Sequence, residues 1–422
     1  MSYRFPTRRL AAIADRVPPT EGASHFRIAL DAVAPWTGAL EVEIDDLHPG
    51  EGAEFKIGDI LFGKLRPYLA KAWVADRPGV YYGDFINIRA HRDTNPNFLG
   101  YAIRTPRFID VATAVSSGSK MPRTEWASLR EISIPIPAQP MQGRIADYLD
   151  HETTEIDRFI ADQERLSTLL VERRDAVLAR TVVSASSDDS ASEVPWSPGL
   201  RTPFPVLNIR RAAAMRTGHT PNRSTPEYWA GDRDIPWFTL ADVWQLRAGH
   251  KYLGETREHI THEGLSNSAA ELLPAGTVVL SRTASVGFAG IMPNAMATTQ
   301  HYWNWVPGSH LDSEYLWLQF RAMRPYFSKI SSGATHKTIY DADAAGMEIV
   351  LPPLETQREI VAELTSTDVT TEALISDSTR AIALAKERRA ALITAAVTGQ
   401  IDVTAKHRPA AEQLEDDIKE LT

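Results

Sequence analysis

A long internal repeat constrains this chain more than any other feature of its sequence. When the sequence is shifted by 215 residues against itself, 18 of the 68 positions from 116 to 183 are identical, and no gap is needed. The identities include Gln142 with Gln357 and a Glu-Arg-Arg triplet at 172–174 and 387–389. Solenoid repeats have periods of about 20 to 50 residues. A period of 215 therefore indicates that one domain and its following helix occur twice.

Each copy contains a stretch with the spacing of a long helix. In the first copy a 4-3 pattern predicts a heptad stripe over about residues 142–183, formed by Ile145, Leu149, Ile156, Phe159, Leu166, Leu170 and Val177. The second helix is expected to end at Gly399, a residue suited to a C-terminal cap. Two unrelated surface helices are one interpretation. The matched length and register favour the other, a coiled coil between the two copies.

The rest of each copy has the pattern of a mixed domain, so we predict an α+β fold class with two pseudo-repeated lobes. Strand-like runs occur at 59–65, 80–88, 277–282 and 301–306, and short helical stretches follow at 99–109 and 313–323. We divide the chain into a first lobe (1–139), a first long helix (140–183), an exposed Ser-rich linker (184–200), a second lobe (201–354), a second long helix (355–403) and a tail (404–422).

Composition and missing motifs exclude several classes of protein. Cysteine is absent, which excludes disulfides, thiolate catalysis and iron-sulfur ligation. No run of about 18 apolar residues occurs, so we expect a soluble, cytoplasmic protein with no membrane contact. The sequence has no phosphate-binding loop and no His-Glu-x-x-His, and the 12 histidines lack metal-ligand spacing. The "NPNF" at 95–98 lacks the second proline of adenine methyltransferases. We therefore expect no catalytic residue, no metal and no cofactor.

Several motifs resemble the DNA-specificity subunit of type I restriction-modification systems. They are "GDILFGKLRPYLAKAW" at 58–73, "SRTASVGFAGI" at 281–291, "ATTQHYWNW" at 297–305, "IVLPPLETQREIVAEL" at 349–364 and "ERRAALITAAVTGQIDV" at 387–403. The resemblance extends over nearly the whole chain up to about Val403. The first copy departs from it, because it has "IPAQPMQGRI" at 136–145 where the second copy has "LPPLETQREI".

This resemblance implies a fold and a set of partners. Each lobe would be a target-recognition domain, and the two helices would pair as an antiparallel coiled coil that docks two methyltransferase subunits. The implied target is double-stranded DNA with two different half-sites, one for each lobe. Restriction and translocase subunits would complete the complex, and S-adenosylmethionine and ATP would bind to the partners. The alternatives are a stand-alone tandem-domain DNA-binding regulator and a coiled-coil scaffold that binds only proteins.

Candidate DNA contacts are basic, amide and hydroxyl side chains in loops near glycine, because these groups match phosphates and base edges. We select Lys64, Arg66, Lys120 and Arg123 in the first lobe and Thr220, Asn222, Arg223, Arg282, His336 and Lys337 in the second. Each of these could instead be an ordinary solvated side chain.

The Glu-Arg-Arg triplets have two interpretations. Glu172, Arg173, Arg174, Glu387, Arg388 and Arg389 could form ion pairs on the helix surface, or they could dock partner subunits, which we favour.

The net charge of −9 does not exclude DNA binding. The first lobe has 17 Lys and Arg against 16 Asp and Glu, and the second has 14 against 13. The acidic excess therefore lies in the helices, linker and tail. Binding by the chain alone should be weak, with partners supplying much of the contact to phosphates.

Overall fold

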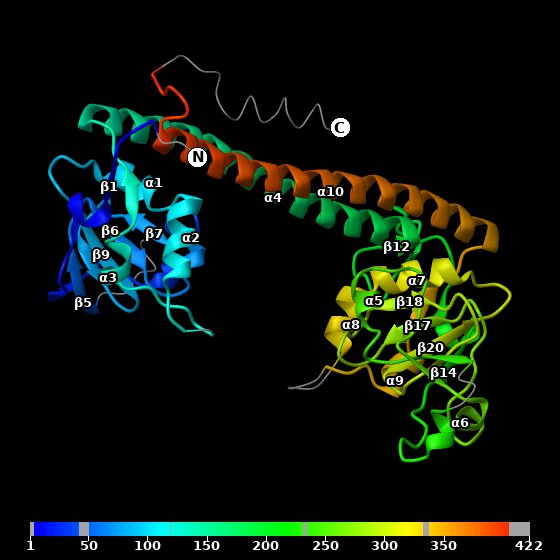
Figure 1. The fold of residues 1–422 in the computed structure, drawn as a ribbon. Coiled ribbons are helices and arrows are strands. Elements are labelled where there is room, and N and C mark those ends of the chain that lie inside the picture. Colours follow the sequence, from blue (N-terminus) through cyan, green and yellow to red (C-terminus); the bar gives the residue numbers. More distant parts are fainter. Residues whose placement is uncertain (1–3, 42–49, 119, 231–233, 332–336, 405–422) are drawn as a thin grey trace. The chain divides into compact units, whose positions relative to one another are not determined.

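The computed structural model describes residues 4–41, 50–118, 120–230, 234–331 and 337–404, and it divides the chain into two compact units. Unit 1 combines residues 1–166 with 377–422, and unit 2 comprises residues 167–376. The divisions fall inside the two long helices and not at the ends of the lobes. Each unit therefore contains one lobe, the start of one long helix and the end of the other (Figure 1).

The first lobe is built on two four-stranded sheets. The central sheet has the order β2-β9-β6-β7, with β2 Ala14–Arg16, β9 Phe85–Ala90, β6 Asp59–Gly63 and β7 Ala72–Val74. The second has the order β3-β5-β8-β4, with β3 Glu21–Ser24, β5 Gly50–Phe55, β8 Gly79–Tyr81 and β4 Arg27–Ile28. The remaining elements are the pair β1 Thr7–Arg9 and β10 Ser133–Pro135, the helices α1 Pro96–Ala102, α2 Pro106–Ala114 and α3 Trp126–Leu129, and the short 3-10 turns η1 Leu10–Ala12, η2 Leu30–Ala32 and η4 Pro67–Leu69.

The second lobe repeats this arrangement. Its central sheet has the order β14-β20-β17-β18, with β14 Ala213–Thr217, β20 Tyr302–Pro307, β17 Val278–Ser281 and β18 Ala289–Ile291. A smaller sheet has the order β16-β15-β19, with β16 Glu258–Ile260, β15 Ile235–Phe238 and β19 Ala297–Thr298. The other elements are the pair β13 Val206–Asn208 and β21 Glu348–Val350, the helices α5 Trp244–Arg247, α6 His262–Ser266, α7 Ser313–Ala322, α8 Arg324–Ile330 and α9 Asp341–Ala345, and the 3-10 turns η5 Ile209–Arg211 and η6 Pro226–Tyr228.

The predicted α+β class with two related lobes is confirmed, and one predicted strand requires correction. The run at 80–88 forms the end of β8 and the start of β9, which belong to different sheets. Gly83, with φ of +84°, turns the chain between them. This left-handed conformation is open to glycine and strained for most other residues.

Each lobe core contains residues from the start of one long helix and from the end of the other, and these residues occupy the same repeat positions in both lobes. Helix α4 (Gln139–Val182) has 44 residues and α10 (Leu354–Thr398) has 45. The first lobe core contains Ile145 and Leu149 from the start of α4, with Ile393 and Val397 from the end of α10. The second lobe core contains Ile360 and Leu364 from the start of α10, with Leu178 and Val182 from the end of α4. These four pairs are 215 residues apart, so burial in the two lobes accounts for these positions of the repeat.

A buried glutamine fixes the start of each helix to its lobe. The Oε1 of Gln142 accepts a hydrogen bond of 2.8 Å from the backbone N–H of Asn95, which caps α1. Its Nε2 donates to the carbonyls of Asp93 and Pro137. Gln357 repeats this pattern in the second lobe. Its Oε1 accepts from the backbone N–H of Asp312, and its Nε2 donates to the carbonyls of His310 and Pro352. Both glutamines are at most 1% exposed.

Within unit 1 the two helices run antiparallel, as expected. Ile156 and Ile160 of α4 pack on Ala385 of α10. The guanidinium of Arg389 forms a bidentate ion pair with Asp157, with bonds of 2.9 and 3.1 Å. The paired positions rise along α4 as they fall along α10, which defines the antiparallel direction.

The apolar stripe of the first helix is less continuous than its sequence predicts. Leu166 is 44% exposed, whereas the spacing places it in the seam. Nearby, the hydroxyl of Ser378 on α10 donates to the carbonyl of Gln163 at 3.0 Å. A polar contact therefore replaces apolar packing at this point, because the second copy has a serine where a coiled coil normally has an apolar residue. At the end of α10, Gly399 has φ of +76° and terminates the helix as predicted.

The predicted exposed linker is partly wrong. The segment contains β11 (Ser192–Glu193), which pairs with β12 (Arg201–Thr202). Val194 and Trp196 are buried in the core of the second lobe. Burial of these two apolar side chains stabilises the contact with the lobe, although the serines that precede them are polar. This part of the segment therefore belongs to the lobe. No described helix is both long and apolar enough to cross a membrane.

Replacing Gln142 with alanine should destabilise the first lobe by about 2 to 4 kcal/mol, because three buried backbone groups lose their partner. Hydrogen exchange of the β6 and β9 amides in the full chain would measure this change as faster opening. The control is Gln139→Ala, which removes one exposed bond to the carbonyl of Arg92 and should cost no more than about 0.5 kcal/mol. Equal effects of the two variants would contradict the role given to Gln142.

Candidate nucleic-acid interface

Two loops of the first lobe are joined by backbone hydrogen bonds and bring the predicted DNA contacts together. The first loop follows β6 and contains Lys64 and Arg66, and the second contains Pro122 and Thr124. The N–H of Arg66 donates to the carbonyl of Pro122 at 2.8 Å, and the N–H of Thr124 donates to the carbonyl of Lys64 at 3.0 Å. Ser117 and Arg123 exchange two further bonds at the base of the second loop. These bonds hold the loops as one unit, although they are more than 50 residues apart in the sequence.

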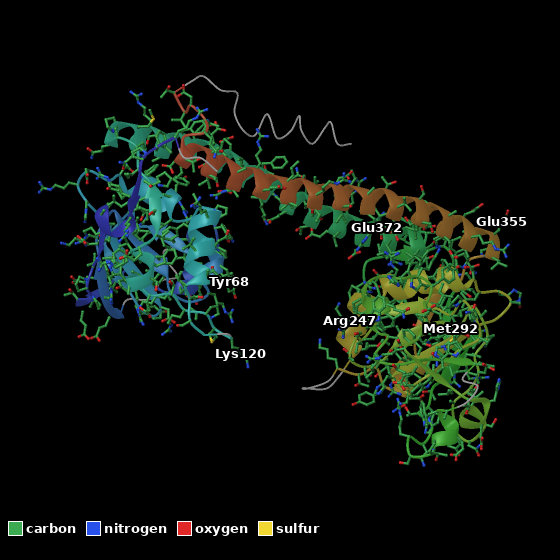
Figure 2. The ribbon with its side chains drawn as sticks, in the orientation of Figure 1. Tyr68, Lys120, Arg247, Met292, Glu355 and Glu372 are labelled. Carbon is green, nitrogen blue, oxygen red and sulfur yellow. The ribbon has the colours of Figure 1, made fainter. Side chains whose placement is uncertain are left out.

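The four predicted residues of this lobe lie on the joined loops. Arg66 and Lys120 are exposed and Lys64 is half-buried. Arg66 has φ of +51°. Arg123 forms an ion pair of 2.6 Å with Asp84, which holds its guanidinium in one orientation. Figure 2 shows Lys120 on the loop that extends beyond α2.

The second lobe contains an equivalent pair of loops. Arg282 follows β17 as Lys64 follows β6, and its carbonyl accepts a 3.0 Å bond from Ile339 N–H. Its own N–H donates to the carbonyl of His301, as that of Lys64 donates to Asp84. Ala284 has φ of +58°, matching the conformation of Arg66. The structure therefore places Lys64 and Arg282 at the same position of the two lobes, which the sequence offset alone did not show.

Arg282 is held over an aromatic ring. Its guanidinium carbon lies 4.2 Å from the ring centre of Trp303, a buried residue of β20. Burial lowers the pKa of Arg282 from its ordinary value, and Asp341 and Tyr340 oppose this shift. The side chain remains a cation at neutral pH, because an arginine pKa stays far above 7. A stacked cation of this kind suits a phosphate or a guanine edge.

Three other predicted residues of the second lobe, Thr220, Asn222 and Arg223, form a group next to the smaller sheet. Arg223 forms a 2.6 Å ion pair with Glu258 and lies 4.1 Å from the ring centre of Trp229. The indole N–H of Trp229 donates to the carbonyl of Asn222. The hydroxyl of Thr220 donates to Oε1 of Gln300 at 2.8 Å. Arg223 therefore supports local structure, while Thr220 points to a residue that the sequence reasoning did not select.

Gln300 and His301 connect the two groups. Gln300 bonds to Thr220, and Nδ1 of His301 lies 2.9 Å from the hydroxyl of Thr283 in the loop that contains Arg282. Burial and the neighbouring Arg282 lower the pKa of His301, so its ring is neutral at pH 7. Both residues belong to the "ATTQHYWNW" motif. Their position in the loop directly before strand β20 was the signal that could have identified them.

Lys337 is exposed and lines a separate hollow of about 390 Å³ with Ser285, Ser328 and Ser331. Arg247, labelled in Figure 2, donates to the Ser285 hydroxyl at 2.5 Å. It therefore places a second cation, besides Arg282, at the loop after β17. His336 lies outside the described residues.

The Glu-Arg-Arg triplets differ from a simple docking surface. Arg389 is 8% exposed, and its guanidinium is committed to Asp157. Arg174, at the equivalent repeat position, is half-buried. Glu172, Arg173 and Glu387 are exposed, and Arg388 is partly so. The third residue of each triplet is therefore turned inward, because residues two apart on a helix face different directions.

Within the part of the chain that the structure describes, no cluster of three or more metal-ligating side chains occurs. The "NPNF" segment has a structural explanation. The Asn95 side chain caps α1 by accepting from the N–H of Phe98, and Pro96 occupies the first turn of that helix. This is an ordinary helix start.

Comparisons with known proteins agree on which proteins this chain is similar to. Residues 212–382 match the family described as type I restriction modification DNA specificity domain. The chain is 30% identical over 165 residues to the type I restriction enzyme MjaIX specificity subunit of Methanocaldococcus jannaschii, which is 39% of this chain and 37% of that protein. It is 23% identical over 287 residues to the StySPI specificity subunit of Salmonella potsdam, covering 65% and 58% of the two chains. The aligned regions thus span less than two thirds of these relatives.

Solved structures show the same fold over nearly the full chain. A chain from a study of complex assembly in the type I R-M system aligns with a TM-score of 0.69 and 20% identity, covering 95% of this chain and 100% of that one. The HsdS subunit from Thermoanaerobacter tengcongensis aligns with a TM-score of 0.56 and 19% identity, covering 94% and 97%. The resemblance identified from sequence motifs is confirmed.

Replacing Lys64 or Arg282 with alanine should weaken binding to a non-specific duplex, because each change removes one cation. The slope of log affinity against log salt should fall by about 1 for each variant. Lys56→Ala is the control, since Lys56 is an exposed residue that precedes β6 at the end opposite Lys64. A slope that falls equally for the control would show that only total charge matters.

Proposed function

We propose that this chain is the DNA-recognition subunit of a type I restriction-modification complex. Each lobe reads one half-site, so the target is split and asymmetric. The chain itself performs no catalysis. Methyltransferase subunits bind S-adenosylmethionine, flip an adenine out of each half-site and methylate it, while restriction and translocase subunits use ATP. The complex acts in the cytoplasm.

One observation carries this proposal. Two lobes with matching central sheets present different side chains from the same loop positions. Asp84 and His301 occupy one such position, since each carbonyl accepts from the N–H of the equivalent residue, Lys64 or Arg282. In the first lobe Asp84 pairs with Arg123, whereas in the second His301 contacts the hydroxyl of Thr283. A duplicated scaffold with divergent loops is what reading two different sequences requires, because base identity is recognised by side chains and position is fixed by the frame.

Exposed apolar side chains on the long helices support a protein partner. Within unit 2, Leu169 of α4 is 51% exposed, and Val369 and Leu374 of α10 are 64% and 49% exposed. Large apolar residues at such exposure often mark interaction sites. Together with the exposed Glu172 and Arg173 of the same unit, they form a surface on which one methyltransferase subunit docks, and the exposed Glu387 of unit 1 belongs to the surface for the other.

The two alternatives make different demands. A stand-alone tandem-domain regulator would bind DNA without partners, and a coiled-coil scaffold would bind partners without sequence-specific DNA contact. The near-neutral lobes favour a complex over a lone regulator, because partners must then supply part of the contact to phosphates.

Exchanging residues 201–354 for the equivalent lobe of a related protein should change one half-site and leave the other unchanged. Sequencing of modified sites in cells that carry the whole complex would show this. The matched control exchanges residues 1–139 and should change the other half-site only. A change in both half-sites from a single exchange would contradict separate reading by the two lobes.

The pure chain should neither bind S-adenosylmethionine nor methylate DNA, because those steps belong to the partners. Calorimetry with S-adenosylmethionine should show no binding heat, and the same titration of the co-purified complex should show two sites per copy of this chain. Purification of the chain alone from its host would favour the regulator. Co-purified partners without sequence-specific DNA protection would favour the scaffold.

A further inference from the structure

We infer that Gln300 reads an adenine in the half-site bound by the second lobe and that Thr220 positions its side chain. This inference rests on the proposed function and names one base contact within it. Gln300 lies in the short loop between β19 and β20 and is exposed.

The loop that holds Gln300 is fixed on both sides. Thr299 N–H donates to the carbonyl of Phe238 at 3.1 Å, and His219 N–H donates to the carbonyl of Thr298 at 3.0 Å. Directly after the loop, the fully buried Tyr302 donates its hydroxyl to the carbonyl of Thr239 at 2.8 Å. An exposed side chain thus projects from an anchored backbone, which is the arrangement that accurate base reading requires.

The amide of Gln300 is oriented before any ligand binds. Its Oε1 accepts the Thr220 hydroxyl at 2.8 Å, which leaves the second lone pair of this oxygen available. Among the described residues, none accepts a hydrogen bond from its amide nitrogen. One acceptor and one donor side by side match adenine, whose major-groove edge offers the N6 donor and the N7 acceptor. Prior orientation lowers the entropy lost when the contact forms.

The residues near Gln300 include both neutral groups and one cation. The Gln300 amide contacts the neutral Thr220 hydroxyl, and the next residue, His301, has a ring that is neutral at pH 7 because burial and Arg282 lower its pKa. The cation of this region is Arg282, whose charge lowers the pKa of His301 and whose backbone N–H donates to the His301 carbonyl at 3.1 Å. A neutral amide at the base edge with a cation to one side fits a base contact next to a phosphate contact.

The first lobe provides an internal comparison. Strand β9 starts at Phe85 and β20 at Tyr302, and both strands pair with the central strand in the same register, with Ile60 opposite Ile88 and Val278 opposite Trp305. The residue that corresponds to Gln300 is therefore Gly83, which has no side chain. The first lobe cannot make this contact. The two lobes thus differ in chemistry at one defined point of a shared frame.

The test uses the full-length chain in the complex that co-purifies with it and a duplex library with randomised half-sites. The wild-type complex should select adenine at one fixed position of the half-site that follows the second lobe. Gln300→Ala should lower the preference for adenine at that position about 5- to 150-fold, the range of a good bidentate contact. The other positions and the other half-site should keep their preferences. Gln300 is exposed, so its replacement should not prevent folding, and Gln300→Asn is a second variant that retains the amide.

Thr220 and a control separate reading from general effects. Thr220→Val should lower the adenine preference, whereas Thr220→Ser should retain it, because only the hydroxyl orients the amide. Asn294→Ala removes another exposed amide, before β19 instead of after it, and should have no effect. Unchanged selectivity in Gln300→Ala, or an affinity loss equal for all four bases, would overturn the inference. A wild-type complex with no sequence preference would instead refute the proposed function.

Discussion

The structure of each half depends on one buried glutamine. Gln142 and Gln357 each join the first turn of a long helix to the backbone that caps a short helix of the lobe. Because this side chain satisfies three buried backbone groups at once, the helix cannot leave the lobe without exposing or orphaning them. The end of the other long helix completes each lobe core at positions 215 residues apart, such as Leu178 and Ile393. The duplicated sequence is therefore needed twice, once at each lobe.

This constraint separates the frame from the surface that is proposed to read DNA. The frame is fixed by burial and by backbone hydrogen bonds, including those that join the loops after β6 and β17 to the loops near Thr124 and Ile339. Side chains on these loops can then vary without loss of the fold, because their backbone groups are already paired. Lys64 and Arg282 keep a cation at the same position, while Gly83 and Gln300 differ completely. Shared cations suit the phosphates common to all DNA, and divergent groups suit the bases.

The distribution of charge follows the same division of roles. Several cations near the loops are already partnered, as Arg123 is by Asp84 and Arg223 by Glu258. Such pairing orients a guanidinium but reduces its pull on distant phosphates. The acidic excess lies on the helices, the linker and the tail. On the helices Glu172 and Glu387 are exposed, as are the apolar Val369 and Leu374. This distribution of charge fits the proposed selection of a sequence within a complex, and it does not favour DNA binding by charge alone.

The sequence by itself determined the duplication, both long helices, the end of the second helix at Gly399, the α+β class and the inner strands β6, β9, β17 and β20 of the central sheets, because these depend on periodic burial and local conformation. It also located Lys64, Arg66, Lys120 and Arg123, since basic residues near glycine mark loops. Only the tertiary structure showed that Lys64 and Arg282 are equivalent, that Arg389 faces inward to Asp157 and that Trp196 is buried. It alone brought Thr220 to Gln300 across 80 residues. Such pairs leave no periodic signal, because the contact depends on how separate strands pack and not on the spacing along either one.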